Sequence, residues 1–202
     1  YIDAIEIFFE EPDRLERPGC ELAYEQAMAQ LSRHYPEDRE AALIYALALL
    51  TSVMPTDTSD ASRLKAAAIL EPMLIAQPDH PGVGFYLLQT YDTPALGQRG
   101  LRLARQSTKL AAVGPYALHL SAHVFTRIEL WEEAIRANLV AIYAVTGLSD
   151  SQSADMAASQ RLHAMDVLVY AYLQRGEERA AKHVLDKLQT NPPDTVEDLV
   201  GA

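Results

Sequence analysis

The chain has 202 residues, 49% of them hydrophobic, and its 28 acidic residues against 17 Lys and Arg give a formal net charge of −11. This acidic balance repels polyphosphate and anionic lipid, so we expect no nucleic acid among the partners. Its one cysteine, Cys20, excludes an internal disulfide framework, and no apolar run reaches the roughly 20 residues that span a bilayer, so we expect no membrane insertion.

The predicted elements are helices, because Ala and Leu are abundant while Gly and Pro number only 9 and 11. Apolar residues recur at helical spacing in pairs of segments separated by short polar breaks. Pro72 lies inside one such segment and predicts a kink or a break there. We expect antiparallel helical hairpins at approximately 1–36, 37–78, 79–114, 115–147 and 158–189, which together form a single all-α domain over 1–202.

The fourth hairpin has the clearest pattern. Leu118, Ala122 and Phe125 share one face of its first helix, and Trp131 and Ala134 begin the same periodicity in the second. Because only three residues, 128–130, join the two segments, the helices must run antiparallel.

These residues resemble a tetratricopeptide repeat (TPR). Ala122 and Ala134 stand at its small positions and Phe125 and Trp131 at its aromatic ones, while Glu129 replaces the usual Gly at the turn. In the fifth hairpin the matching residues are Ala171, Tyr172, Gly176 and Ala181. The corresponding positions 85 and 119 differ by 119 − 85 = 34, which is the period of this repeat class. The resemblance implies a right-handed superhelix of about five hairpins, whose first helices line a concave groove.

A narrower resemblance covers most of residues 1–190. The runs YPEDREAALIYALALL, ALHLSAHVFTR and LHAMDVLVYAYLQ are similar to a group of poorly characterised bacterial TPR proteins. That group carries His where this chain has Phe85 and Gln89, and Met-Pro-Ser in place of residues 120–122. Its members are longer, so the resemblance implies that this chain is the C-terminal part of a longer protein. It implies no established reaction.

The resemblance also implies which side chains face the groove. Groove positions in the repeat lie one turn apart on each first helix, and neighbouring polar residues extend the patch. The candidate ligand-binding residues are Phe85, Gln89, Asp92, His119, His123, Arg127, His163, Asp166 and Tyr170.

Three functions follow from this patch. The first is a binding scaffold that accepts a peptide, a protein or a small polar ligand without a cofactor, because stacked helices offer an extended surface. The alternative is an enzyme, in which His119, His123 and Asp166 hold a divalent metal, or His123 acts as general base with Asp166 orienting it. The second alternative is a self-association module. We expect a soluble protein of the cytoplasm or the periplasm.

The remaining histidines have simpler interpretations. His34, His80 and His183 lie near the predicted helix ends and are expected at the surface, with His80 at the start of a helix. We interpret Trp131 as a packing residue, whereas the spacing of Tyr170 fits the core and the groove equally.

Overall fold

The computed structural model describes residues 1–10, 17–53, 59–107, 115–146 and 154–190. Within these ranges the regular secondary structure is helical and includes no strand, which confirms the all-α class. No helix in this part of the chain combines the length and the apolar character needed to cross a membrane. Residues 11–16 and 147–153, which belong to polar breaks between the predicted segments, lie outside the described residues.

The chain divides into two compact units, Tyr1–Thr90 and Tyr91–Ala202, where the sequence predicted a single domain. The boundary falls inside the predicted hairpin 79–114. Its first helix therefore belongs to the first unit and its second helix to the second unit.

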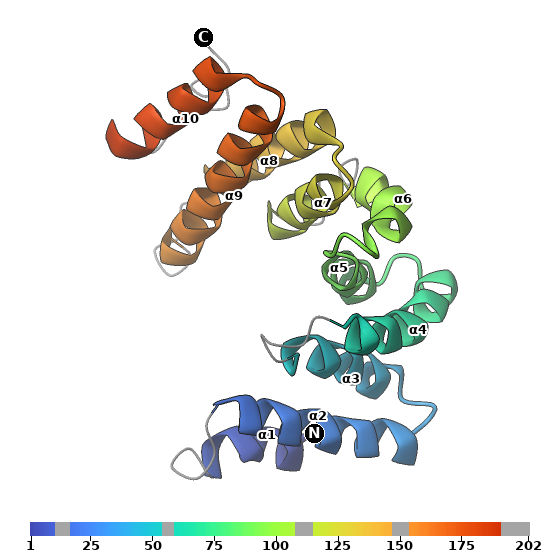
Figure 1. The fold of residues 1–202 in the computed structure, drawn as a ribbon. Coiled ribbons are helices and arrows are strands. Elements are labelled where there is room, and N and C mark those ends of the chain that lie inside the picture. Colours follow the sequence, from blue (N-terminus) through green and yellow to red (C-terminus); the bar gives the residue numbers. More distant parts are fainter. Residues whose placement is uncertain (11–16, 54–58, 108–114, 147–153, 191–202) are drawn as a thin grey trace. The chain divides into compact units, whose positions relative to one another are not determined.

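The described part of the first unit contains the consecutive helices that Figure 1 labels α1 to α5. Each contacts the next in the chain, and α3 also contacts α5. Contacts between near neighbours are typical of helical repeats, in which each hairpin buries its apolar face against the next one. The bounds are α1 Ile2–Glu10, α2 Arg17–His34, α3 Arg39–Thr51, α4 Ala61–Ala76 and α5 Pro81–Thr90.

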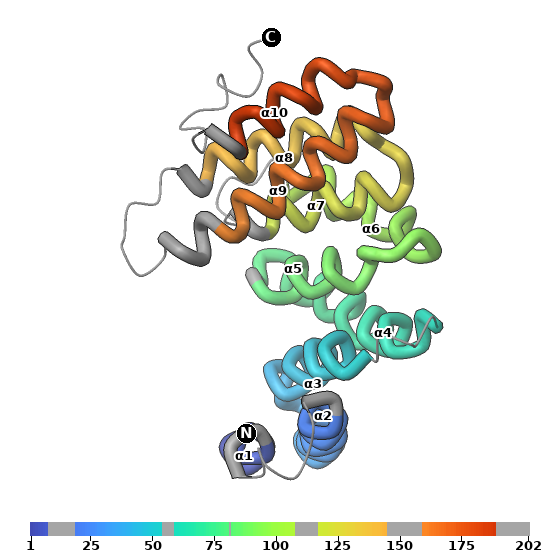
Figure 2. Tube along the Cα trace, turned by 60° about the vertical axis from the view of Figure 1, so that its left-hand side comes forward, coloured from blue at the N-terminus to red at the C-terminus, as the bar shows by residue number. Residues whose placement is uncertain are grey.

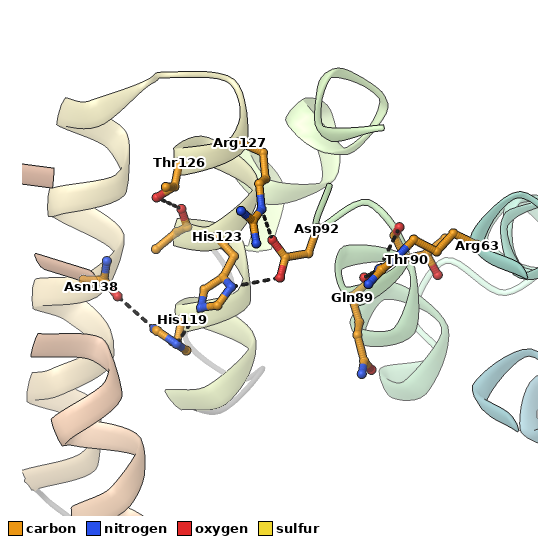
Figure 3. Close-up of polar contacts among 10 residues, drawn as sticks. Arg63, Gln89, Thr90, Asp92, His119, His123, Thr126, Arg127 and Asn138 are labelled. Atoms are coloured by element: carbon orange, nitrogen blue, oxygen red, sulfur yellow. Dashed lines mark hydrogen bonds and ion pairs between the residues drawn. The ribbon is translucent and has the colours of Figure 1, made fainter. Parts of the chain in front are cut away.

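Polar side chains fix the ends of these helices. The Asp38 carboxylate accepts a hydrogen bond from the Ala41 N–H at 3.1 Å and caps α3. His80 accepts from the Val83 N–H at 3.4 Å, which agrees with its predicted place at a helix start. The Arg63 guanidinium donates to the Gln89 carbonyl at 2.7 Å and thereby ties α4 to the C-terminal end of α5 (Figure 3).

Pro72 does not interrupt α4, so of the two predicted outcomes, a kink or a break, the break is wrong. Proline removes one helical hydrogen bond, which costs most where the freed carbonyl has no access to water. Pro72 is exposed, while Ala66, Leu70 and Met73 on the opposite face are buried. The apolar face therefore keeps the helix continuous.

The second unit contains the helices α6 to α10, which lie side by side in both views (Figures 1 and 2). Consecutive helices contact each other from α6 onwards, and α7 also contacts α9. Leu118, Ala122 and Phe125 are all buried, which confirms the predicted packing face of the fourth hairpin. The bounds are α6 Gly97–Ser107, α7 Pro115–Arg127, α8 Trp131–Thr146, α9 Ala154–Gln174 and α10 Glu178–Thr190.

Two hairpins of the second unit turn in the same way. Glu129 has a φ of 61° and Gly176 a φ of 72°. The N–H of the following residue donates in each case to a carbonyl five residues earlier, that of Phe125 in the fourth hairpin and that of Tyr172 in the fifth, both at 2.9 Å. This bond belongs to the Schellman motif that ends many helices. Glu129 and Gly176, which the sequence assigned to equivalent turn positions, therefore occupy equivalent positions in the structure.

Candidate functional site: a histidine cluster beside an open pocket

Seven of the nine candidate residues belong to the second unit. His119, His123 and Arg127 occur at successive turns of α7, so their side chains follow one face of that helix. His163 and Asp166 are on α9, which contacts α7. Helical spacing and helix packing together gather these side chains.

A continuous polar chain runs from α8 across α7 to Asp92 (Figure 3). His119 Nδ1 lies 2.9 Å from Asn138 Oδ1, and its Nε2 lies 2.9 Å from Nε2 of His123. On the other side, His123 Nδ1 lies 2.9 Å from one oxygen of Asp92, and Arg127 Nε donates to the other at 2.8 Å. Three hydrogen bonds and the close contact between the two Nε2 atoms thus hold both imidazoles in fixed orientations.

The partners of the chain determine where the protons sit. The Asn138 amide nitrogen donates to the Ala134 carbonyl at 3.1 Å, so its oxygen accepts from His119 Nδ1. Asp92 accepts from His123 Nδ1 in the same way when it is ionised. Both histidines therefore carry a proton on Nδ1 and turn Nε2 toward each other.

Burial and charge shift two pKa values in this network. Desolvation lowers the pKa of His119 to about 4, and the neighbouring His123 and His163 add to this effect despite the hydrogen bond to Asn138. For Asp92, burial alone would raise the pKa, but the hydrogen bonds and charges of His123 and Arg127 outweigh it and hold the pKa below its usual range. At neutral pH, His119 is therefore neutral and Asp92 is ionised.

His163 completes a group of three imidazoles. Its ring centroid lies 4.7 Å from that of His119 and 5.3 Å from that of His123. One ring nitrogen of each histidine lies within 4.8 Å of the others, and among the described residues these three form a group whose geometry could hold a metal ion. Asp166, which the sequence proposed as the third ligand, is not in this group, whose third member is His163, about one turn earlier on α9.

An open pocket of about 550 Å³ lies next to the histidines. His123 and Arg127 line it from α7, and Asp166 and Tyr170 from α9. The Trp131 and Tyr170 rings meet edge to face in it, with centroids 5.8 Å apart. The other lining residues are Pro94, Thr126, Glu129, Val167 and Gln174.

The remaining candidates either belong to the first unit or have other surroundings than the sequence predicted. Phe85 and Gln89 are on α5 in the first unit, where Phe85 packs edge to face on Tyr86. His119 has only 3% of its surface exposed, so it is a buried residue rather than an open groove position. Tyr170, by contrast, is 48% exposed and belongs to the pocket.

Asn138 on α8 was not among the candidate residues predicted from the sequence. It is fully buried and its amide orients His119. An amide among the apolar residues of α8 was the available signal, since buried polar groups require partners. Trp131 lines the pocket as well as packing, which the sequence did not predict.

No protein-family model matches the chain, and no significant match was found among curated proteins or solved structures.

Proposed function

We propose that this protein is a binding scaffold of the TPR type, whose second unit accepts a short peptide or a small polar ligand in the pocket between α7 and α9. The observation that carries the proposal is the combination of one cation, Arg127, with the Trp131–Tyr170 aromatic pair in a pocket of about 550 Å³. Ligand pockets of roughly 300–1,000 Å³ typically pair apolar walls with a few oriented polar groups.

Arg127 is suited to hold a carboxylate. Among the described residues it bonds to Asp92 through Nε, which leaves its terminal amino groups for a ligand. Such a fixed guanidinium recognises a carboxylate through two parallel hydrogen bonds. Because Asp92 already orients Arg127, little side-chain entropy is lost on binding.

The other polar groups favour a ligand that also has hydrogen-bond donors. Asp166 and Glu129 contribute exposed carboxylates to the same pocket, and Gln174 contributes an amide. A peptide offers donors, acceptors and an apolar side chain within a short span, which suits this lining and the aromatic pair.

A peptide library displayed on phage tests the proposal. We expect selection on the full chain to enrich peptides that bind it, and Arg127→Met or Tyr170→Ala to weaken their binding at least about tenfold, as loss of an interface anchor does. Arg136→Met is the matched control, because Arg136 pairs with Glu132 on the exposed surface of α8 and is not among the pocket residues. Enriched peptides that bind both pocket variants as tightly as the parent would refute the proposal.

A second candidate, an acid–base enzyme, is supported by His123, which lines the pocket and is hydrogen-bonded to the Asp92 carboxylate. A carboxylate that orients a histidine is a common feature of general-base catalysis. The orienting acid here is Asp92, whereas the sequence suggested Asp166. Hydrolysis of a panel of chromogenic esters that His123→Gln abolishes and Arg136→Met preserves would favour the enzyme. Equal rates in all three proteins would exclude this chemistry for esters.

A further inference from the structure

The three imidazoles of His119, His123 and His163 come from two different helices and converge within 4.8 Å. Neutral histidine is the commonest protein ligand for transition metals. Imidazoles also converge in sites that hold no metal, so the contacts that orient each ring are decisive.

Two of the rings have the supporting contacts that metal ligands require. A metal-bound histidine usually donates its other ring N–H to a carboxylate or a carbonyl oxygen, which fixes the tautomer and aims the free nitrogen. His123 donates to Asp92, and His119 donates to the Asn138 amide oxygen. Both partners are themselves fixed, Asp92 by Arg127 and Asn138 by the Ala134 carbonyl.

This arrangement leaves two nitrogen lone pairs facing each other. With Nδ1 protonated on both rings, the two Nε2 atoms 2.9 Å apart repel each other unless a positive charge lies between them. Either a proton or a metal ion can supply that charge. Two nitrogens bound to one tetrahedral ion at about 2.0–2.1 Å lie roughly 3.3 Å apart, so a small rotation of either ring accommodates the metal.

His163 supplies the third nitrogen. It is exposed, and its ring lies against those of His119 and His123. Its side chain is therefore able to turn toward an ion held by His119 and His123. Three histidines with a fourth position open to solvent make up one of the known zinc coordination types.

We propose that His119, His123 and His163 bind one divalent metal ion of the class that prefers imidazole, with Zn²⁺ as the first choice. The group lacks the several oxygen ligands that Mg²⁺ and Ca²⁺ require, and nitrogen donors favour zinc, copper and nickel. Asp92 and Asn138 are positioning residues in this site. Because His123 also lines the pocket, the ion lies beside any ligand bound there. The site does not depend on the proposed peptide binding.

The experiment uses the full chain, treated with chelator and then titrated with ZnCl₂ by calorimetry, with CoCl₂ as a spectroscopic probe. We expect one zinc per chain and the visible absorption of four-coordinate Co²⁺. His163→Gln should lower zinc affinity by more than about tenfold. Loss of a supporting contact alone costs about 10–100-fold, and loss of a ligand should cost at least as much. Because His163 is exposed, this variant keeps the fold, which far-UV circular dichroism verifies.

Two further variants separate coordination from general damage. Asp92→Ala should weaken zinc binding about 10–100-fold, while Asp92→Asn, which keeps an oxygen acceptor for His123, should restore part of it. His183→Gln, a histidine of α10 outside the cluster, should leave zinc binding unchanged. Absence of zinc binding by the parent chain, or equal affinity in the parent and His163→Gln, would overturn the site.

Discussion

Gly100 lies where α6 approaches α7. A Cβ atom at this position would be 3.0 Å from Tyr91 Cβ and 3.0 Å from Val124 Cγ1, closer than ordinary contact. Replacing glycine by alanine inside a helix normally stabilises by about 0.5–1 kcal/mol, whereas overpacking a core costs about 1–3 kcal/mol. Both neighbours are buried, so the steric cost should win. We predict that Gly100→Ala lowers the free energy of unfolding by about 1 kcal/mol in urea denaturation.

Gly82→Ala is the control for this prediction. Its nearest neighbour would be the terminal Cδ2 methyl of Leu43 at 3.3 Å, which a small side-chain rotation relieves. We expect a change within about 0.5 kcal/mol. A Gly100→Ala protein as stable as the parent would show that α6 can move away from α7 without loss.

At the residue scale, helical spacing was sufficient to predict that His119, His123 and Arg127 share a face. It did not reveal that His119 is buried, because burial depends on α8 and α9 packing over it. The role of Asn138 was hidden for the same reason. A contact between residues 19 positions apart has no local sequence signal.

At the element scale, the two turns with positive φ offer a matched pair. Glu129 adopts a φ of 61°, a backbone conformation that costs a side-chain-bearing residue about 1–2 kcal/mol. Gly176 adopts a φ of 72° without that cost, and nothing lies within 4 Å of a Cβ built there. We predict that Glu129→Gly raises, and Gly176→Ala lowers, the free energy of unfolding by about 1 kcal/mol.

Thermal and urea denaturation measure both changes. Glu129→Ala separates the backbone from the side chain, since it removes the carboxylate but keeps the strained conformation. We expect this variant to differ from the parent by less than Glu129→Gly does. Equal stabilisation by both substitutions would assign the effect to the charge of Glu129 and not to its φ angle.

The helices themselves were largely predictable, because apolar periodicity and polar breaks are local signals. The residues at which the helices begin and end were less predictable. α9 begins at Ala154, four residues before the predicted start of the fifth hairpin at 158, and α4 continues through Pro72. In both cases the helix extends where sequence signals alone favour a stop, and for α4 the buried face explains why.

At the scale of the whole molecule, the sequence predicted one domain and one patch of nine residues. The two-unit division assigns Phe85 and Gln89 to the first unit and the other seven residues to the second. Repeat periodicity assigns equivalent positions within each hairpin but does not determine where an array divides, because that depends on contacts between hairpins. The superhelical arrangement of the hairpins stays a prediction.

The division into two units predicts how the protein unfolds. The single tryptophan, Trp131, is in the second unit, so its fluorescence reports that unit, while circular dichroism reports helices of both. Leu70 in the first unit and Leu168 in the second are fully buried, and each Leu→Ala change should cost about 2–5 kcal/mol. We expect Leu168→Ala to lower the urea midpoint of Trp131 fluorescence by about 1 M or more.

Leu70→Ala, by contrast, should lower the urea concentration at which the first unit loses its circular dichroism signal. It should leave the midpoint of the Trp131 fluorescence transition unchanged. In this case the two probes separate, because each unit has its own buried core and repeat arrays lose stability locally. A fluorescence midpoint that falls equally in both variants would mean that the chain unfolds as one cooperative body. In that case the stability of the second unit would depend on both halves of the chain. Independent units would instead allow the pocket and the histidine cluster of the second unit to be studied without altering the first unit.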